Sequence, residues 1–309
     1  MKKKNNTLFY VLLSILLFYR PHLMASDSES KYPYQLSICT VFRDDARFLK
    51  EWIEFHLLVG VEHFYLFNHL SQDNYLSVLK PYMDKGIVEL FDWPLEILIP
   101  TQWDIIQSTA IQAGIHKAKS KTKWLAIIDT DEFIIPMQSD NLVEGLQEFE
   151  EFGGIQINWQ CYGTSNIEQI PEDALITELL VMKAPYDHEK NINVKSIVRP
   201  QRVLFCNHVH YVHYQPGYFS VNEQGEEIPP KQWGIKNFST NKFRINHYWT
   251  RDEEYFKKDK LDRIEKRQHP TLEMVLRHKE EMNTVFDDVM LRFVAQMKNR
   301  MFTQKNDEN

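Results

Sequence analysis

The stretch Trp124-Leu-Ala-Ile-Ile-Asp129-Thr-Asp131-Glu132-Phe133 places two carboxylates directly after an apolar run. Such a run predicts a buried β-strand, and residues i and i+2 of an extended segment lie on one side of it. Asp129 and Asp131 would therefore converge at the carboxyl end of the strand, where they repel each other unless a cation neutralises them. Oxygen ligands suit Mn²⁺ or Mg²⁺. We predict a divalent-cation site at Asp129 and Asp131; a helix cap or an acidic turn is the alternative.

Three more apolar runs of strand length precede this one, separated by segments with helical spacing. The expected strands are 36–42, 61–68, 87–93 and 124–129, and the expected helices run from Asp45 to Gly60, over 75–83 and over 102–119. This alternation predicts a parallel sheet covered by helices on both faces. Ligands of such sheets bind beyond the carboxyl ends of the strands, so the loops that follow residues 42, 67 and 128 matter most.

The pattern becomes mixed after Pro136. We expect a short helix at 142–149, strands at 154–162, 194–198 and 203–214, and a long loop at 217–238. Beyond Arg251 the chain is expected to be helical, with one apolar stripe that docks on the core. Its members are Met282, Val285, Phe286, Val289, Met290, Phe293 and Met297. The fold class is thus α/β: a mixed, mainly parallel sheet flanked by helices in a domain over 33–250, with a C-terminal helical segment over 251–309 packed on it.

The composition excludes several classes of protein. The 309 residues carry a net charge of −7, which disfavours binding to nucleic-acid phosphates. The three cysteines lack the spacing of a zinc site, and each is expected to be a small buried residue. Residues 1–26 join three lysines to an 11-residue apolar run, too short to span a bilayer, which predicts a signal peptide or short membrane anchor. We therefore expect an exported or membrane-associated protein.

Several motifs together resemble one known family. Residues 40–56 and 60–68, the stretch 124–136, Lys195-Ser-Ile-Val-Arg-Pro200 and Asn246-His-Tyr-Trp249 are similar to segments of glycosyltransferase family 92. The likeness covers roughly residues 35–260, and the motifs in this order are far more specific than any one of them. The resemblance implies a GT-A fold and inverting transfer of a sugar, often galactose, from a nucleotide-sugar donor such as a UDP-sugar to a glycan or other hydroxyl acceptor.

Donor-binding residues are expected in the loops at the carboxyl ends of the strands. The candidates are Arg43, Asp44, Asn68, Asp73 and Gln102. Asp73 is suited to accept hydrogen bonds from ribose hydroxyls, and Arg43 to pair with a phosphate. Asp44 and Asp73 could equally serve as helix caps, and the two roles do not exclude each other.

Histidines supply candidates for a further metal ligand. The resemblance to GT-A enzymes implies that His247 is the third ligand beside Asp129 and Asp131. The residues at 208, 210 and 213 are also histidines, which we interpret as structural or acceptor-side residues, although one could replace His247. Lys258 and Lys260 could neutralise a diphosphate, but a solvated helix face is the favoured interpretation.

The catalytic base is not selected by the sequence. Inverting transfer needs a carboxylate that takes the proton of the acceptor hydroxyl. Residues 159–166 resemble a family motif that shapes the acceptor pocket, and four acids follow it: Glu168, Glu172, Asp173 and Asp187. Spacing does not distinguish among them.

Two other functions remain open on the sequence. A hydrophobic strand that ends in two aspartates also occurs in phosphohydrolases of the haloacid dehalogenase type, where it is the first strand of the domain; here about ninety residues of strand and helix precede it. A non-catalytic carbohydrate-binding protein on the same fold is the other alternative, and it would not need both Asp129 and Asp131.

Overall fold

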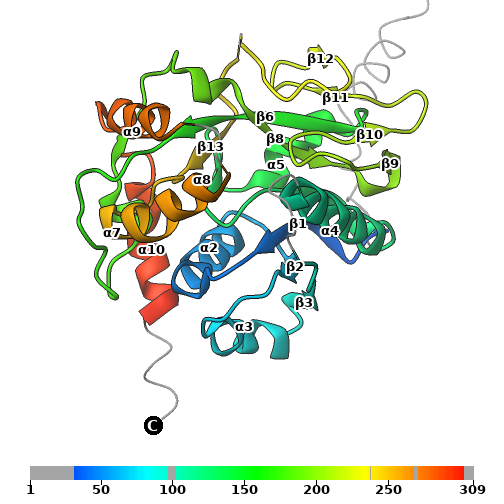
Figure 1. Ribbon diagram of the computed structural model, residues 1–309. Coiled ribbons are helices and arrows are strands. Elements are labelled where there is room, and N and C mark those ends of the chain that lie inside the picture. Colours follow the sequence, from blue (N-terminus) through cyan, green and yellow to red (C-terminus); the bar gives the residue numbers. More distant parts are fainter. Residues whose placement is uncertain (1–30, 97–101, 237, 268–270, 303–309) are drawn as a thin grey trace, which may run out of the picture. The chain divides into compact units, whose positions relative to one another are not determined.

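The N-terminal half of the central sheet consists of four parallel strands in the order β3-β2-β1-β4 (Figure 1). Their bounds are Tyr34–Phe42 (β1), His63–Asn68 (β2), Val88–Asp92 (β3) and Thr122–Ile127 (β4). β2 is buried along its whole length, as expected for a strand with helices on both faces. All four carboxyl ends therefore lie along one edge of the sheet.

The other half of the sheet is mixed. β8 is antiparallel to both β4 and β6, and β13 pairs with β6 in parallel and with β5 antiparallel. The strands of this half are β5 (Glu132–Pro136), β6 (Gly154–Cys161), β8 (Val194–Val198), β11 (Ser220–Val221), β12 (Glu227–Ile228) and β13 (Phe243–His247). The predicted mixed, mainly parallel sheet flanked by helices is confirmed. β11 and β12 lie in the segment 217–238, where the prediction of an uninterrupted loop was wrong.

Helices cover the two faces of the sheet. Ile38 of β1 shares one core cluster with Trp52 of α2, whereas Cys39 packs in a second cluster with Ala110 of α4. Alternate residues of β1 thus serve opposite faces, as the two-residue period of a strand requires. The helices of this part are α2 (Ala46–Leu58), α3 (Tyr75–Asp84), α4 (Gln102–Ala118), α5 (Leu142–Leu146) and α6 (Ile176–Leu179), with 3₁₀ turns at Gln147–Phe149, Glu189–Ile192 and Pro200–Arg202.

The C-terminal part is helical, but its apolar stripe is interrupted. Phe293 of α10 packs edge-on against Phe55 of α2, with ring centroids 5.4 Å apart. Val285 and Phe286 instead form an exposed strand, β14, so the prediction of a single docked stripe was wrong for them. The elements here are α7 (Glu253–Tyr255), a π-helical turn (Phe256–Lys260), α8 (Leu261–Arg267), α9 (Leu272–Glu281), β14 (Val285–Phe286) and α10 (Leu291–Phe302).

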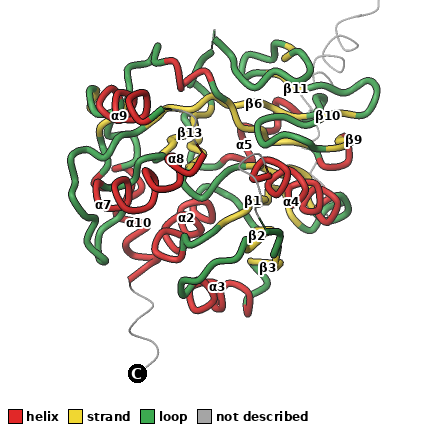
Figure 2. The backbone as a smooth tube through the Cα atoms, in the orientation of Figure 1, coloured by secondary structure: helices red, strands yellow, loops and turns green. Residues whose placement is uncertain are grey.

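Two small ribbons are separate from the central sheet, and the strands β9 and β10 of one of them are labelled in Figure 2. β7 (Met182–Lys183) pairs with β14, and β9 (Val203–Phe205) pairs with β10 (His213–Tyr214). The strand expected over 203–214, interrupted by histidines, is a two-stranded ribbon whose connecting loop holds His208 and His210. The break begins at two consecutive polar residues, Asn207 and His208.

The computed structural model describes residues 31–96, 102–236, 238–267 and 271–302. From Tyr32 onward the chain forms one compact unit. The expected signal segment at 1–26 lies outside the described residues. Among the helices of the described part, none has both the length and the apolar character that a bilayer crossing requires. The three cysteines are buried and free, as expected.

Candidate active site

Three side chains meet beyond the carboxyl end of β4. Asp131, Glu132 and His247 offer ligand atoms that all lie within 4.8 Å of one another, and we call them the cation cluster. Asp131 belongs to the turn after β4, Glu132 begins β5, and His247 ends β13 directly opposite Glu132. The sheet register therefore brings residues 115 positions apart into one site.

The cation cluster holds polar atoms that lack partners. His247 Nε2 lies 3.5 Å from Asp131 Oδ1. Glu132 Oε1 and His247 Nδ1 are buried and have no hydrogen-bond partner among the described residues. Buried polar atoms are rarely left unpaired because the desolvation cost is not recovered. Two carboxylates and an imidazole fit the ligand preferences of Mn²⁺. The residues of the cation cluster thus fit a divalent cation, which Asp131 and His247 would hold together with a second carboxylate.

Asp129 occupies a different environment. Its Oδ2 accepts a hydrogen bond from the Lys195 ammonium at 2.8 Å, and the same ammonium lies 3.6 Å from Glu132 Oε2. Lys195 is 1% exposed, while the Asp129 side chain is 36% exposed and open to solvent. The backbone N–H of Asp129 donates to Glu132 Oε2 at 2.9 Å. Lys195 therefore sets one positive charge against the two carboxyl groups of Asp129 and Glu132.

Two further cations border Asp131. Lys260 of the π-helical turn lies with Nζ 3.9 Å from Asp131 Oδ2 and over the ring of Trp249. Arg251 is buried and donates to Asp45 Oδ1 at 2.6 Å, and its backbone has φ of +51°. The interpretation of Lys260 as part of a solvated helix face is wrong, because the turn aims its side chain inward. Lys258, by contrast, is exposed.

These charges shift the ionisation of the site. Burial would raise the pKa of Asp131, but nearby His247 and Lys260 outweigh it and lower that pKa. Burial raises the pKa of Glu132 well above its usual value, although Lys195 opposes the effect. Burial also lowers the pKa of Lys260 to about 8. Asp131 thus remains ionised, as a metal ligand must be.

The loops after β1 and β2 are tied to each other. Asp44 N–H donates to Ser71 Oγ at 3.0 Å, and Asp44 Oδ1 accepts from the N–H of Gln72 at 2.6 Å. Asp73 Oδ2 accepts from the N–H of Ala46 at 2.7 Å, so Asp73 caps α2 from the neighbouring loop. The possible cap of α2 by Asp44 is wrong, because the Asp44 side chain accepts from Gln72 and not from the start of α2.

The other candidate donor-binding residues differ in how far their side chains are already engaged in contacts within the protein. Asn68 donates to Tyr75 and to Asp92 at 2.9 and 3.1 Å, which orders the end of β2. Arg43 is 43% exposed and lies 3.5 Å from Asp44, so it remains available to a ligand. Gln102 begins α4. The structure brings four of the five candidates, all except Gln102, to the loops of β1 and β2.

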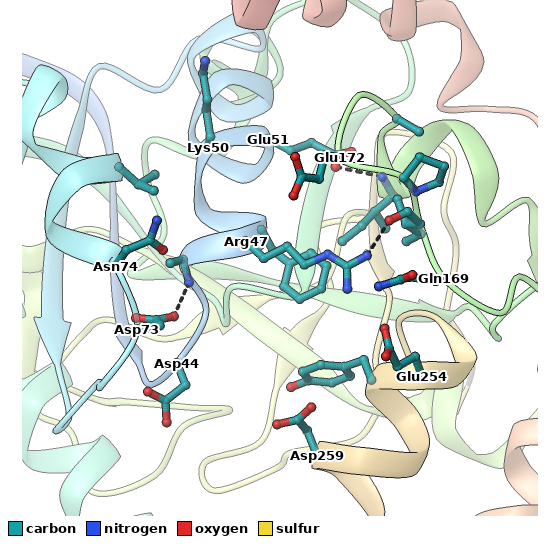
Figure 3. Close-up of a pocket in the computed structure, with 18 of the residues that line it drawn as sticks. Asp44, Arg47, Lys50, Glu51, Asp73, Asn74, Gln169, Glu172, Glu254 and Asp259 are labelled. Atoms are coloured by element: carbon teal, nitrogen blue, oxygen red, sulfur yellow. Dashed lines mark hydrogen bonds between the residues drawn. The ribbon is translucent and has the colours of Figure 1, made fainter.

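A cleft of about 940 Å³ opens beside these loops (Figure 3). Asp44 and Asp73 line one side, Glu172 lines the other, and Arg47 extends across toward Gln169. Arg47 donates to the carbonyl of Ile170 at 2.6 Å. The cation cluster does not contribute to the described lining of this cleft, so the cleft and the cation cluster are separate features.

The four candidate bases lie in exposed positions. Glu168 pairs with Lys257 at 3.1 Å and is 75% exposed. Glu172 lines the cleft of Figure 3, Asp173 is exposed, and Asp187 lines a separate hollow beside His188. Among the described contacts of the cation cluster, none involves these four acids. Their assignment stays a prediction.

Several site residues were missed by sequence reasoning. Lys195 stands in the buried strand Val-Lys-Ser-Ile-Val, where it is the one charged residue, and a charged residue in such a strand was the available signal. Glu132 likewise opens an apolar strand that was not assigned. Arg251 and Asp45 carried no signal, because their pairing joins segments 206 residues apart.

Several known proteins with similar sequences are named for one family. A glycosyltransferase family 92 protein of Ricinus communis is 27% identical over 198 residues, which cover 62% of this chain and 33% of the relative. The β-1,4-galactosyltransferase galt-1 of Caenorhabditis elegans is 25% identical over 211 residues, 63% of this chain and 47% of that protein. The matched part of the chain thus spans about a third to a half of these relatives.

Solved structures share the arrangement only loosely. Staphylococcus aureus TarS in complex with UDP-GlcNAc aligns with a TM-score of 0.38 at 9% identity, covering 88% of this chain and 74% of that one. The Pyrobaculum calidifontis mannosyltransferase PcManGT, in complex with GDP-Man and Mn²⁺, aligns at 0.33 and 11% identity, covering 73% and 66%. Scores this low carry no functional information.

The family model gives the decisive match. It extends over residues 32–280, which include all four strand-end loops, the cation cluster and the π-helical turn. The chain belongs to glycosyltransferase family 92.

Proposed function

We propose that this protein transfers a hexose, most simply galactose, from a nucleotide-diphosphate sugar to a hydroxyl group of a glycan acceptor, with inversion and with a divalent cation. The cation cluster in a family 92 chain is the single observation that carries the proposal. The relative named as a β-1,4-galactosyltransferase supports galactose as the first sugar to test.

The residues of the chain have separable parts in this proposal. Asp131 and His247 hold the cation, and Asp129 or Glu132 supplies the second carboxylate. A bound Mn²⁺ or Mg²⁺ supplies stabilisation of the negative charge that develops on the departing diphosphate. Lys260 and Arg251 add positive charge on the same side of Asp131. Arg43 and Asp44 contact the nucleotide from the loop after β1.

The proton of the acceptor hydroxyl needs a carboxylate acceptor. The candidates remain Glu168, Glu172, Asp173 and Asp187. For any of them to act, either its loop must move toward the acceptor or the bound acceptor must extend to it. A group within hydrogen-bond reach of the hydroxyl is required.

A donor screen tests the proposal. The purified full chain is incubated with Mn²⁺ and a panel of UDP- and GDP-sugars, and released nucleoside diphosphate is measured with and without oligosaccharide acceptors. We expect release from one UDP-hexose, lost in Asp131→Asn and retained in Asp140→Asn, an exposed acid outside the site. Release of orthophosphate from simple phosphate esters, abolished by Asp129→Asn, would identify a phosphohydrolase instead. A chain that binds sugars but uses no donor would be a non-catalytic binding protein.

A further inference from the structure

A row of rings leads away from the cation cluster. The ring of His247 lies 4.2 Å from that of Trp159 on β6. Trp159 in turn lies 5.4 Å from His210, and His210 lies 5.3 Å from His208. All of these distances join ring centroids and fall in the range of direct aromatic contact. The rings therefore form a continuous path from β6 to the loop of the β9–β10 ribbon.

The path continues to the outer surface of the ribbon. His208 stacks on Tyr211 at 4.5 Å with planes 9° apart, and Tyr211 lies 5.7 Å from His213. His213 stacks on Phe205 at 4.1 Å and 17°. We define the aromatic row by six residues: Trp159, His210, His208, Tyr211, His213 and Phe205.

The aromatic row runs from the edge of the core, where Trp159 packs, to the exposed ribbon. Phe205 is 41% exposed, its neighbour Leu204 is 55% exposed, and the other five members are partly exposed. Apolar rings that only stabilise a fold are normally covered, and contiguous exposed ones mark binding surfaces. The indole N–H of Trp159 is buried and has no acceptor among the described residues.

The aromatic row is electrically neutral. Its six members include no lysine, arginine or carboxylate. Burial lowers the pKa of His208 and of His213, and it lowers that of His210 to about 3, so the imidazoles are uncharged at neutral pH. One nitrogen of each imidazole already bonds within the protein: His208 Nδ1 accepts from the His210 N–H, His210 Nδ1 bonds the Val194 carbonyl, and His213 Nε2 bonds Asn207 Oδ1. The second nitrogen of each neutral imidazole is the one suited to a hydroxyl group, which can both donate and accept.

The position of the row separates it from the expected nucleotide site. The loops after β1 and β2 lie at one half of the sheet, whereas the row begins on β6 and contacts β8, where His210 Nδ1 bonds the carbonyl of Val194 at 2.7 Å. The cation cluster follows β4, which stands between β1 and β8 in the sheet. A donor held by the first half and a second ligand held along the row would thus meet at the cation cluster.

We propose that the aromatic row binds the sugar chain of the acceptor, a neutral oligosaccharide of hexoses whose C–H faces stack on the rings. Axial hydrogens of a pyranose carry slight positive charge and match the negative face of an aromatic ring. Hydroxyl groups at the rim of the sugar reach the imidazole nitrogens. Several rings in succession suit a chain of sugars rather than one. The role of this oligosaccharide as an acceptor rests on the proposed function, but its binding to the aromatic row requires no donor.

Binding without a donor tests the aromatic row. The full chain is titrated calorimetrically with β-1,4-linked galactose oligomers of one to five units, and with glucose oligomers of the same lengths. We expect affinity to rise with length. Phe205→Ala and Tyr211→Ala should each weaken binding of the longest oligomer about two- to tenfold, the equivalent of one lost aromatic contact, and leave the monosaccharide unchanged.

A matched control lies on the other ribbon. Phe286 is 62% exposed on β14, and Phe286→Ala should bind every oligomer as the unchanged chain does. Circular dichroism confirms that the variants fold. The inference is overturned if neither oligomer series binds, if the row variants match Phe286→Ala, or if they weaken binding of UDP instead. Row-dependent sugar binding in a chain that transfers nothing would keep this inference and remove the proposed function.

Discussion

The ammonium of Lys195 lies 2.8 Å from Asp129 Oδ2, and both residues stand at the edge where β4 and β8 run antiparallel. Lys195 is fully buried, and it also lies close to Glu132, whose carboxylate is buried too. One lysine thus offsets two acids beside the cation cluster. The site has a protein cation of its own, which keeps the carboxylates together before any metal binds.

Replacing this lysine should destabilise the fold. Lys195→Met leaves buried Glu132 without its counter-charge, and we expect the free energy of unfolding to fall by about 3 kcal/mol. Urea denaturation measures the change. Lys80→Met removes an exposed pair with Asp84 and should cost no more than about 0.5 kcal/mol. Equal losses in the two variants would show that Lys195 is not needed for charge balance.

Cation binding should stabilise the protein through Asp131. Saturating Mn²⁺, at about 100 times its dissociation constant, would add about 2.7 kcal/mol to the free energy of unfolding. Asp131→Asn should abolish the rise in melting temperature, and Asp140→Asn should preserve it. A rise that persists in Asp131→Asn would place the cation elsewhere.

The same titration identifies the second carboxylate. Glu132→Gln should remove most of the Mn²⁺ effect if the unpartnered Glu132 Oε1 is the ligand, and Asp129→Asn should do so if Asp129 leaves Lys195 on binding. The sequence-based prediction of Asp129 fails if only Glu132→Gln has an effect.

Acid should weaken the contact between β13 and the segment after β14. Burial would raise the pKa of Asp287, but hydrogen bonds from Arg244 and Tyr162 outweigh it and lower that pKa from 3.8 to about 2. Because the pKa of Asp287 is lower in the folded than in the unfolded chain, its ionised form stabilises the fold. This stabilisation is complete at pH values above the unfolded pKa and is lost as the pH falls toward 2.

The stabilisation by Asp287 is measured by comparing the unfolding free energies of Asp287→Asn and the unchanged chain at several pH values. Their difference in unfolding free energy should shrink by about 1 kcal/mol between pH 6 and pH 3. The difference for Asp140→Asn serves as the reference. A difference for Asp287→Asn that follows the reference at every pH would contradict the assignment.

Packing of α4 on β1 depends on a glycine. A Cβ at Gly114 would lie 2.3 Å from Cys39 Sγ and 3.3 Å from Phe67. Helix propensity alone would make Gly114→Ala stabilising by about 1 kcal/mol, but overpacking should reverse the sign and cost about 1–3 kcal/mol. Thermal unfolding measures this change. Cys39→Ala should relieve the clash, so the double variant should lose less than the two single losses combined.

The strand–helix alternation was predictable because it depends on local patterns. Apolar runs of strand length located β1, β2 and β3, and the first helix was expected to end at Gly60, where the backbone has a φ of +101°. The paired carboxylates after β4 followed from the same reasoning, since the end of a strand fixes where its next residues project.

Only the tertiary structure decided the composition of the site. Glu132 meets His247 through the register of β5 and β13, Lys195 reaches Asp129 across β4 and β8, and Lys260 points inward from a π-helical turn. The break at 282–290 was equally non-local, because Val285 and Phe286 pair with β7, about a hundred residues earlier in the chain. The loop at 206–212 instead joins two neighbouring strands, β9 and β10, that pair with each other. The sequence by itself determined which carboxylates end the strand. Long-range strand pairing determined which charges surround them, since such pairings join residues that no local pattern relates.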